Sequence, residues 1–351
     1  MIEIKEVLQT VFILIIGTLG LAAFGIIFGL LYKGIDRKLS AHMQGRIGPP
    51  IRQPFRDIVK LFTKENIVPE NAIPWVFNLA PLVGLAASIS ILLYLPIGGF
   101  DPIAASKGDL ILILYLLIIP SLALVIGGFA SGSPYATVGA QREMATMIAY
   151  EFPLAIIIIT MAWLIGTNPQ VNAVPFSITT LTQYPVWNLV GIPGMIGLII
   201  LLFVLVLVTP AELSKIPFDA PEAETEIAGG LLTEYSGRNL GMFYLTDAVK
   251  TVVMATLIVA LFFPYNLSPL LGLDNIPAYI IDIIFFLVKI FLVILFSVSL
   301  IRVAIARLKI DQIVYTYWVW LTLIALVGLI LVMWDLQAIA SGWYNPVSGL
   351  V

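Results

Sequence analysis

Apolar residues along this chain gather in long blocks separated by polar and proline-rich stretches. A helix needs about 20 such residues to cross a bilayer, and eight blocks approach that length. The predicted fold is therefore an all-α integral membrane protein, with residues 1–351 forming one polytopic domain. The blocks predict spans at roughly 10–32, 75–97, 109–130, 149–166, 190–210, 243–264, 279–301 and 315–336.

Residues 51–65, IRQPFRDIVKLFTKE, carry a different pattern. Apolar side chains recur there at helical spacing, at Phe55, Ile58, Val59 and Phe62. Basic side chains follow one another at intervals of four, at Arg52, Arg56, Lys60 and Lys64. Two such faces predict an amphipathic helix that lies on the membrane surface or on a partner protein.

The basic residues also predict how the chain is oriented. Fourteen of the eighteen Lys and Arg residues fall in the loops after the first, third, fifth and seventh predicted spans. Cytoplasmic loops are enriched in Lys and Arg. We therefore expect a multi-pass protein of the cell membrane, with the odd-numbered loops and the amphipathic helix cytoplasmic and both termini outside.

Composition argues against several kinds of site. The chain has no cysteine and one histidine, His42, which we expect to be a solvated side chain at the membrane interface. Iron–sulfur clusters normally require Cys thiolates, and zinc sites require several Cys, His or carboxylate ligands. We therefore expect this chain to hold no metal or redox cofactor, and its partners to be the lipid membrane and other subunits rather than nucleic acid.

Several charges lie inside the predicted spans, although a charge at the bilayer centre costs at least ~2.5–3.5 kcal/mol. Asp247 and Lys250 are three residues apart on one helix face, which allows either a self-neutralising pair or a functional role. Asp282 and Lys289 also share a face. We expect Asp282 and Asp335 to reach the outer headgroups.

The stretch SPYATVGAQREMATMIAYEFPLAIIII predicts one helix that runs from the cytoplasmic surface into the fourth span. Glu143 and Tyr150 are seven residues apart and share a face of this helix, with Arg142 and Glu151 beside them. Acids that face a bundle interior are candidates for proton relays. An ordinary interfacial cluster is the alternative.

Residues 210–230, PAELSKIPFDAPEAETEIAGG, follow an apolar block directly. Their three prolines are expected to break any continuous helix, because proline lacks the backbone N–H. Irregular backbone at membrane depth persists only where protein or water covers it. Crowded carboxylates also raise one another's pKa. We therefore predict a water-filled cavity on the cytoplasmic side bordered by acids, which are Glu212, Asp219, Glu222, Glu224 and Glu226. A solvated acidic loop is the alternative.

Three motifs resemble one known family. They are DRKLSAHMQGRIGP (36–49), GAQREMATMIAYE (139–151) and AELSKIPFDAPEAETEIAGGLLTEYSG (211–237). They are similar to the H subunit of bacterial NADH–quinone oxidoreductase, called subunit 1 in mitochondria, and to its relatives in membrane-bound hydrogenases and sulfane reductases. The resemblance covers nearly the whole chain.

The resemblance implies a membrane heel subunit that carries a peripheral electron-transfer arm and contacts antiporter-like membrane subunits. The arm would consist of iron–sulfur subunits and hydrogenase-like or quinone-reductase-like subunits. Residue patterns and resemblance together predict a proton or charge relay of Glu143, Glu151, Glu212, Asp219, Glu222, Glu224, Glu226, Glu234, Asp247 and Lys250. They also predict an arm-docking or quinone-chamber-like set of Asp36, Arg37, Arg46, Arg56, Lys60, Arg142 and Lys215.

The departures from the respiratory pattern favour the hydrogenase and sulfane-reductase branch. The loop after Gly48-Pro49-Pro50 is short, Lys215 stands in place of Arg, Leu232 in place of His, and Glu143 in place of a smaller residue. A quinone-binding respiratory subunit is the alternative. A stand-alone secondary transporter would show duplicated halves, which the sequence lacks. A passive anchor would have no use for buried acids.

Overall fold

The computed structural model describes residues 2–105, 108–168, 174–272 and 275–343, and side chains from residue 14 onward. This part of the chain contains eight helices long and apolar enough to span a membrane and no β-strand, which confirms the predicted all-α fold. Six spans are single helices: α1 (Ile2–Met43), α3 (Pro74–Leu92), α4 (Asp109–Ala130), α5 (Pro134–Thr167), α7 (Ile192–Glu212) and α9 (Gly237–Phe262).

The last two spans are composite helices that each contain a π-helical segment. The seventh span joins α11 (Asn275–Ile294), η4 (Leu295–Ser299) and α12 (Leu300–Ala304). The eighth joins α13 (Ile310–Tyr315), η5 (Thr316–Leu321) and α14 (Thr322–Ala340). The shorter elements are α2 (Gln53–Thr63), α6 (Ile178–Gln183), η1 (Val186–Asn188), η2 (Ala220–Glu222), α8 (Glu224–Ile227), η3 (Gly230–Leu232) and α10 (Ser268–Leu271).

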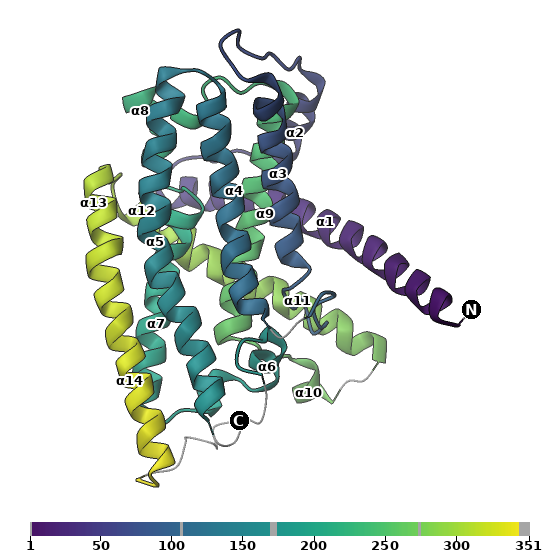
Figure 1. Ribbon diagram of the computed structural model, residues 1–351, viewed down its shortest axis with the longest axis vertical. Coiled ribbons are helices and arrows are strands. Elements are labelled where there is room, and N and C mark those ends of the chain that lie inside the picture. Colours follow the sequence, from purple (N-terminus) through teal and green to yellow (C-terminus); the bar gives the residue numbers. More distant parts are fainter. Residues whose placement is uncertain (1, 106–107, 169–173, 273–274, 344–351) are drawn as a thin grey trace.

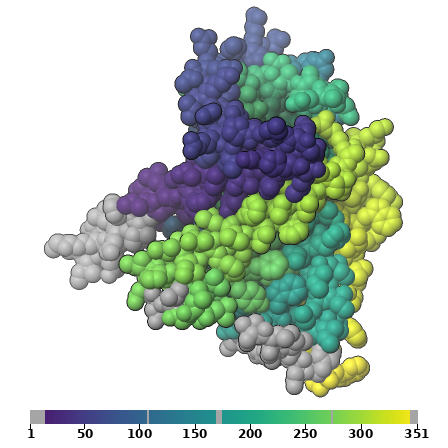
Figure 2. All heavy atoms as spheres, turned by 180° about the vertical axis from the view of Figure 1, so that it is seen from behind, coloured from purple at the N-terminus to yellow at the C-terminus, as the bar shows by residue number. Residues whose placement is uncertain are grey.

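Most spans run along the long axis of the molecule, whereas α1 and α11 cross it obliquely and extend to one side (Figure 1). Seen from behind, these two helices lie against each other across the bundle (Figure 2). The amphipathic helix α2 and the short helix α8 lie at the same end of the bundle (Figure 1). The odd-numbered connections that the sequence assigns to the cytoplasm meet at this end.

Helix α9 is the centre of the bundle, and it packs against α1, α3, α11 and α2. Of its membrane-length window, 94% is buried inside the protein, against 61% or less for the other spans. Helix α9 carries Asp247 and Lys250, so its charges face protein rather than lipid. Because α9 is central, its residues line two neighbouring cavities, described below, at the α2 end of the bundle.

The three prolines expected to interrupt the helix lie at or beyond the end of α7: Pro210 is in its last turn, and Pro217 and Pro221 are in the segment between α7 and α8. The break comes two residues after Pro210, because α7 continues to Glu212. Pro81, Pro120 and Pro153 also lie inside helices. Membrane helices tolerate proline because neighbouring groups satisfy the freed carbonyl. The irregular backbone therefore begins at Leu213, after Glu212.

Candidate functional site

A polar cavity of about 410 Å³ lies at the end of the bundle that carries α2 and α8. Helix α1, the irregular segment after α7, helix α9 and the chain from α12 onward enclose it, and most of its lining is charged. The lining residues are Lys33, Asp36, Arg37, Ser214, Lys215, Ile216, Asp219, Glu222, Glu224, Tyr244, Asp247, Arg302 and Arg307. Such a lining suits water and ions.

Asp247 is held between two lysines on one side of this cavity. Lys215 Nζ donates to both carboxylate oxygens of Asp247, at 2.7 and 2.6 Å, and Lys33 Nζ lies 2.5 Å from Oδ2. Of the two alternatives that the spacing allowed, the self-neutralising pair of Asp247 with Lys250 therefore does not form. Residues three apart share a helix face, but the partners of Asp247 come from α1 and from the irregular segment.

Lys250 pairs instead with Glu212, the last residue of α7. The ammonium lies 2.8 Å from Glu212 Oε1 and donates a 2.7 Å hydrogen bond to Ser121 Oγ. Both charged side chains are almost fully buried, at 6% and 2% exposure. Ser121 is in turn hydrogen-bonded to Tyr150 at 3.3 Å. This buried ion pair lies deeper in the bundle than Asp247.

A small inner cavity of about 50 Å³ connects the two ion pairs. Glu212, Ser121 and Lys250 line it. It shares Ser214, Lys215, Glu222, Tyr244 and Asp247 with the larger cavity. The inner cavity, which holds Glu212 of α7 and Lys250 of α9, therefore lies next to the polar cavity, and the two cavities share part of their lining.

Glu143 and Glu151 extend this arrangement along α5. Ser214 Oγ donates to Glu143 Oε2 at 3.3 Å, which ties α5 to the irregular segment. Among the described residues, Glu143 Oε1 and Glu151 Oε1 are buried without a hydrogen-bond partner. A buried carboxylate oxygen without a donor is costly in its charged form. Both side chains therefore have the setting of proton-accepting groups.

Arginines fix the acidic segment to the bundle. Arg142 NH1 lies 2.6 Å from Glu226 Oε2 and donates to the carbonyl oxygen of Ala220 at 3.2 Å. Arg307 binds Asp219 through both carboxylate oxygens, with Nε–Oδ1 at 2.8 Å. Arg142, which the sequence grouped with the docking residues, thus positions the segment from within the protein.

Asp36 anchors the π-helical part of the seventh span. Ser299 Oγ of η4 donates to Asp36 at 2.6 Å, and Arg302 NH1 donates at 3.0 Å. An extra residue in the π turn rotates the side chains that follow it, and such segments are frequent at functional sites. Asp36 also lines the polar cavity, so it connects this π-helical segment to the cavity.

The four remaining acids of the predicted relay separate into different environments. Glu222 lines the polar and inner cavities, and burial raises its pKa to about 7. Glu224 is exposed at the mouth of the polar cavity. Glu226 is the exposed partner of Arg142. Glu234 lines neither the polar cavity nor the inner cavity.

The predicted docking residues also divide into two groups. Arg37 lines the cavity and reaches Asp57 of α2 at 3.3 Å. Arg56 and Lys60 are exposed on α2, and no described acid forms an ion pair with either. Arg46 is exposed in the loop before α2, hydrogen-bonded to Gln44, and His42 is also exposed.

Sequence reasoning missed several functional groups: Lys33, Ser121, Ser214, Arg302 and Arg307. Lys33 carried a usable signal, because it lies three and four residues before Asp36 and Arg37 and so shares their helix face. The two arginines were counted only as evidence of orientation. Ser121 and Ser214 carry no charge and have no distinctive spacing.

At the opposite end of the bundle, two acids have structural roles, and the prediction that they reach the outer headgroups is wrong. Asp282 accepts hydrogen bonds from the backbone N–H and the hydroxyl of Ser268, at 2.8 and 2.6 Å. Asp335 is fully buried and accepts the Gly191 N–H at 2.7 Å, beside the start of α7. Both satisfy backbone donors that helix starts leave unpaired.

Comparisons with known proteins find relatives in the family that the sequence motifs resemble. A family model described as NADH dehydrogenase matches residues 16–333. The H subunit of NADH-quinone oxidoreductase from Syntrophotalea carbinolica is 32% identical over 74% of this chain and 80% of its own. Hydrogenase-4 component C of Escherichia coli is 34% identical over 74% and 79%. A chain of the membrane-bound sulfane sulfur reductase, an archaeal respiratory membrane complex, superposes with a TM-score of 0.77 at 30% identity, covering 90% of this chain and 98% of that one.

Proposed function

Because the chain belongs to the NADH dehydrogenase subunit 1/H family, we propose that it is the membrane heel of a multi-subunit oxidoreductase that moves ions. Redox chemistry would take place in a peripheral arm, and the buried charges of this chain would couple it to proton or sodium movement in antiporter-like membrane subunits. The observation that carries this proposal is the buried Glu212–Lys250 pair at the end of a continuous set of charged groups.

That set begins in the polar cavity and ends inside the bundle. Glu222 lines both cavities and has a pKa of about 7, so it accepts and releases protons near neutral pH. Ser214 connects the segment to Glu143, and Ser121 connects Lys250 to Tyr150. Hydrogen-bonded groups and a water-sized cavity are the elements that proton transfer requires.

Charge movement without proton transfer along the whole set is also consistent with the geometry. Asp247 shares its charge between Lys33 on rigid α1 and Lys215 on irregular backbone. A shift of the segment after α7 would move Lys215 away from Asp247. Asp247 would then keep only its ion pair with Lys33. The resulting change in field would act on the Glu212–Lys250 pair of the neighbouring inner cavity.

The proposal is tested with the whole assembly in vesicles, where ion movement and redox turnover are measured together. Glu212→Gln and, separately, Glu151→Gln keep the size of the side chain and remove its titration. We expect ion movement per electron to fall at least tenfold while the assembly keeps its subunits. Glu70→Gln, at an exposed loop acid, is the matched control. Full ion movement in both bundle variants would refute the relay.

The electron acceptor is the second part of the proposal. The polar cavity is lined mainly by charged side chains, whereas sites for apolar ligands are lined mainly by apolar ones. Lys215 also offers a point charge in place of the planar fork of an arginine. We propose that the cavity serves coupling and that the assembly reduces a soluble acceptor, protons or a sulfur compound, rather than quinone.

A further inference from the structure

Lys289 of α11 is a cation inside a membrane span that the proposed relay does not use. Its ammonium donates hydrogen bonds to the carbonyl oxygens of Phe263 and Tyr265, at 2.9 and 2.7 Å. Within the described residues no carboxylate lies within ion-pair distance of it. The carboxylate of Asp282, on the same helix, accepts hydrogen bonds from Ser268 instead. The ammonium also lies 4.9 Å from the centroid of the Phe285 ring. A ring face balances only part of a full positive charge, so the cation remains available to an anionic ligand.

An apolar groove of about 510 Å³ begins at this lysine, on the flank of the bundle between α7, α9 and α11. Val288 and Phe296 form its outer side and are 47% and 57% exposed. Its lining residues are Leu202, Val206, Ile258, Phe263, Tyr265, Phe285, Val288, Lys289, Leu292, Val293 and Phe296. Apart from Lys289 and the Tyr265 hydroxyl, these side chains are apolar.

The groove runs from the end of the bundle toward the membrane centre. Phe263 and Tyr265 directly follow the end of α9. Leu202 and Val206 lie ten and fourteen residues inside α7, or roughly 15–21 Å at 1.5 Å per residue. The end of the groove at Lys289 therefore lies near the membrane surface, and its other end lies at the depth of acyl chains.

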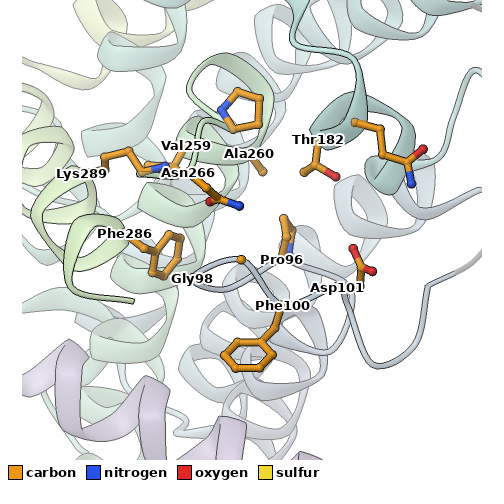
Figure 3. A pocket seen from close by; sticks show the side chains of 13 residues that line it. Pro96, Gly98, Phe100, Asp101, Thr182, Val259, Ala260, Asn266, Phe286 and Lys289 are labelled. Carbon is orange, nitrogen blue, oxygen red and sulfur yellow. The ribbon is translucent and has the colours of Figure 1, made fainter. Parts of the chain in front are cut away.

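Lys289 also lines a polar pocket of about 200 Å³ on its other side (Figure 3). There Lys289 and Phe286 face Asp101 and Thr182 across the opening, with Asn266 beside the lysine (Figure 3). One cation is thus shared between an apolar groove and a polar opening. Lipid headgroups occupy this kind of boundary.

We propose that the groove binds an anionic phospholipid, with its phosphate beside the Lys289 ammonium and an acyl chain between α7 and α11. The groove volume lies within the ~300–1,000 Å³ of small-molecule sites. A zwitterionic lipid would place a second cation near Lys289. An apolar helix of a partner subunit would bury the ammonium with no anion to balance it. Asp101, across the opening, would face the hydroxyl or glycerol part of the headgroup.

The test uses the purified assembly in vesicles that contain a phospholipid with a photoreactive acyl chain, carrying either a phosphatidylglycerol or a phosphatidylcholine headgroup. After illumination, labelled peptides are mapped by mass spectrometry. We expect the phosphatidylglycerol form to label residues 202–206 and 288–296 at least fivefold more than the phosphatidylcholine form. Lys289→Gln should remove this preference, and Lys289→Arg should keep it.

Two further variants keep the result interpretable. Val288→Trp fills the groove without touching the cation, and it should reduce labelling by both lipids. Lys64→Gln, at an exposed cation near the other end of the bundle, should change nothing. Equal labelling by both headgroups would mean an apolar groove without anion recognition. No labelling at these peptides would mean that another subunit covers the groove. Either result overturns the proposal, and neither bears on the relay.

Discussion

At the scale of single residues, the interior charges pair across elements rather than along one helix. Asp247 binds Lys33 and Lys215, and Lys250 binds Glu212, so no pair is visible in the local sequence. Spacing predicts which residues share a helix face, but it does not predict which other element that face meets. This is why most acids of the site could be identified from the sequence while their partners could not.

Asp247→Asn tests the shared ion pair. The variant leaves two ammonium groups close together without their anion, and removing one member of a buried pair is costly. The three side chains keep 14–25% exposure, so we expect a loss of about 2–3 kcal/mol, below the value for fully buried pairs. Thermal unfolding of the purified assembly measures this. Adding Lys33→Met to Asp247→Asn should recover part of the loss, and no recovery would contradict the pairing.

Glu222→Gln tests the raised pKa of Glu222. Because this pKa rises from 4.5 to about 7 on folding, the favourable contribution of Glu222 is complete below about pH 4.5. It is lost as the pH rises through about 7. We therefore expect Glu222→Gln to match the parent melting temperature at pH 4.5 and to exceed it at pH 8. Exposed Glu224→Gln should follow the parent throughout, and parallel curves for Glu222→Gln would be evidence against burial as the cause.

At the scale of elements, hydrophobic periodicity predicted the helices well and their ends less well. The amphipathic pattern of 51–65 became α2, and the pattern of 134 onward became one long helix, α5. The first span is longer than the apolar block because α1 continues through charged residues to Met43. Those residues face the polar cavity, so they do not end the helix. Apolar length alone could not show this.

Charge reversal on α2 tests whether that helix carries the peripheral arm. Asp57 turns toward Arg37 and leaves Arg56 and Lys60 exposed. We expect Arg56→Glu combined with Lys60→Glu to release the soluble subunits from membranes at moderate salt, as measured by sedimentation and blotting. Lys309→Glu, at an exposed cation just before α13, is the control. A variant assembly that stays intact in high salt would show that α2 binds lipid alone.

At the scale of the whole molecule, the bundle separates a charged end from an end where acids have structural roles. The polar cavity and the inner cavity lie around the irregular segment, and a close approach of α5 fixes that segment. A Cβ added at Gly139 would lie 2.7 Å from the Leu231 nitrogen and 3.0 Å from the Pro221 oxygen. The sequence marked this glycine only as part of a motif, because Pro221 and Leu231 lie far from it along the chain.

The acceptor prediction belongs to this scale, because it depends on the cavity as a whole. We expect the purified assembly to reduce protons or a sulfur compound at a rate that quinone-site inhibitors leave unchanged. Extraction and chromatography should find less than one quinone per assembly. Stoichiometric quinone, or turnover that such an inhibitor abolishes, would establish the respiratory alternative.

The central position of α9 has a consequence for how the protein is made. Lys33, Glu212 and Lys215, which neutralise Asp247 and Lys250 of α9, all precede that helix in the chain. Synthesis proceeds from the N-terminus, so these partners have left the ribosome before α9 enters the membrane. A span that would be costly to insert alone thus meets its counter-charges on arrival. Arg302 and Arg307 emerge later, so the wall of the polar cavity closes around a charge network already assembled.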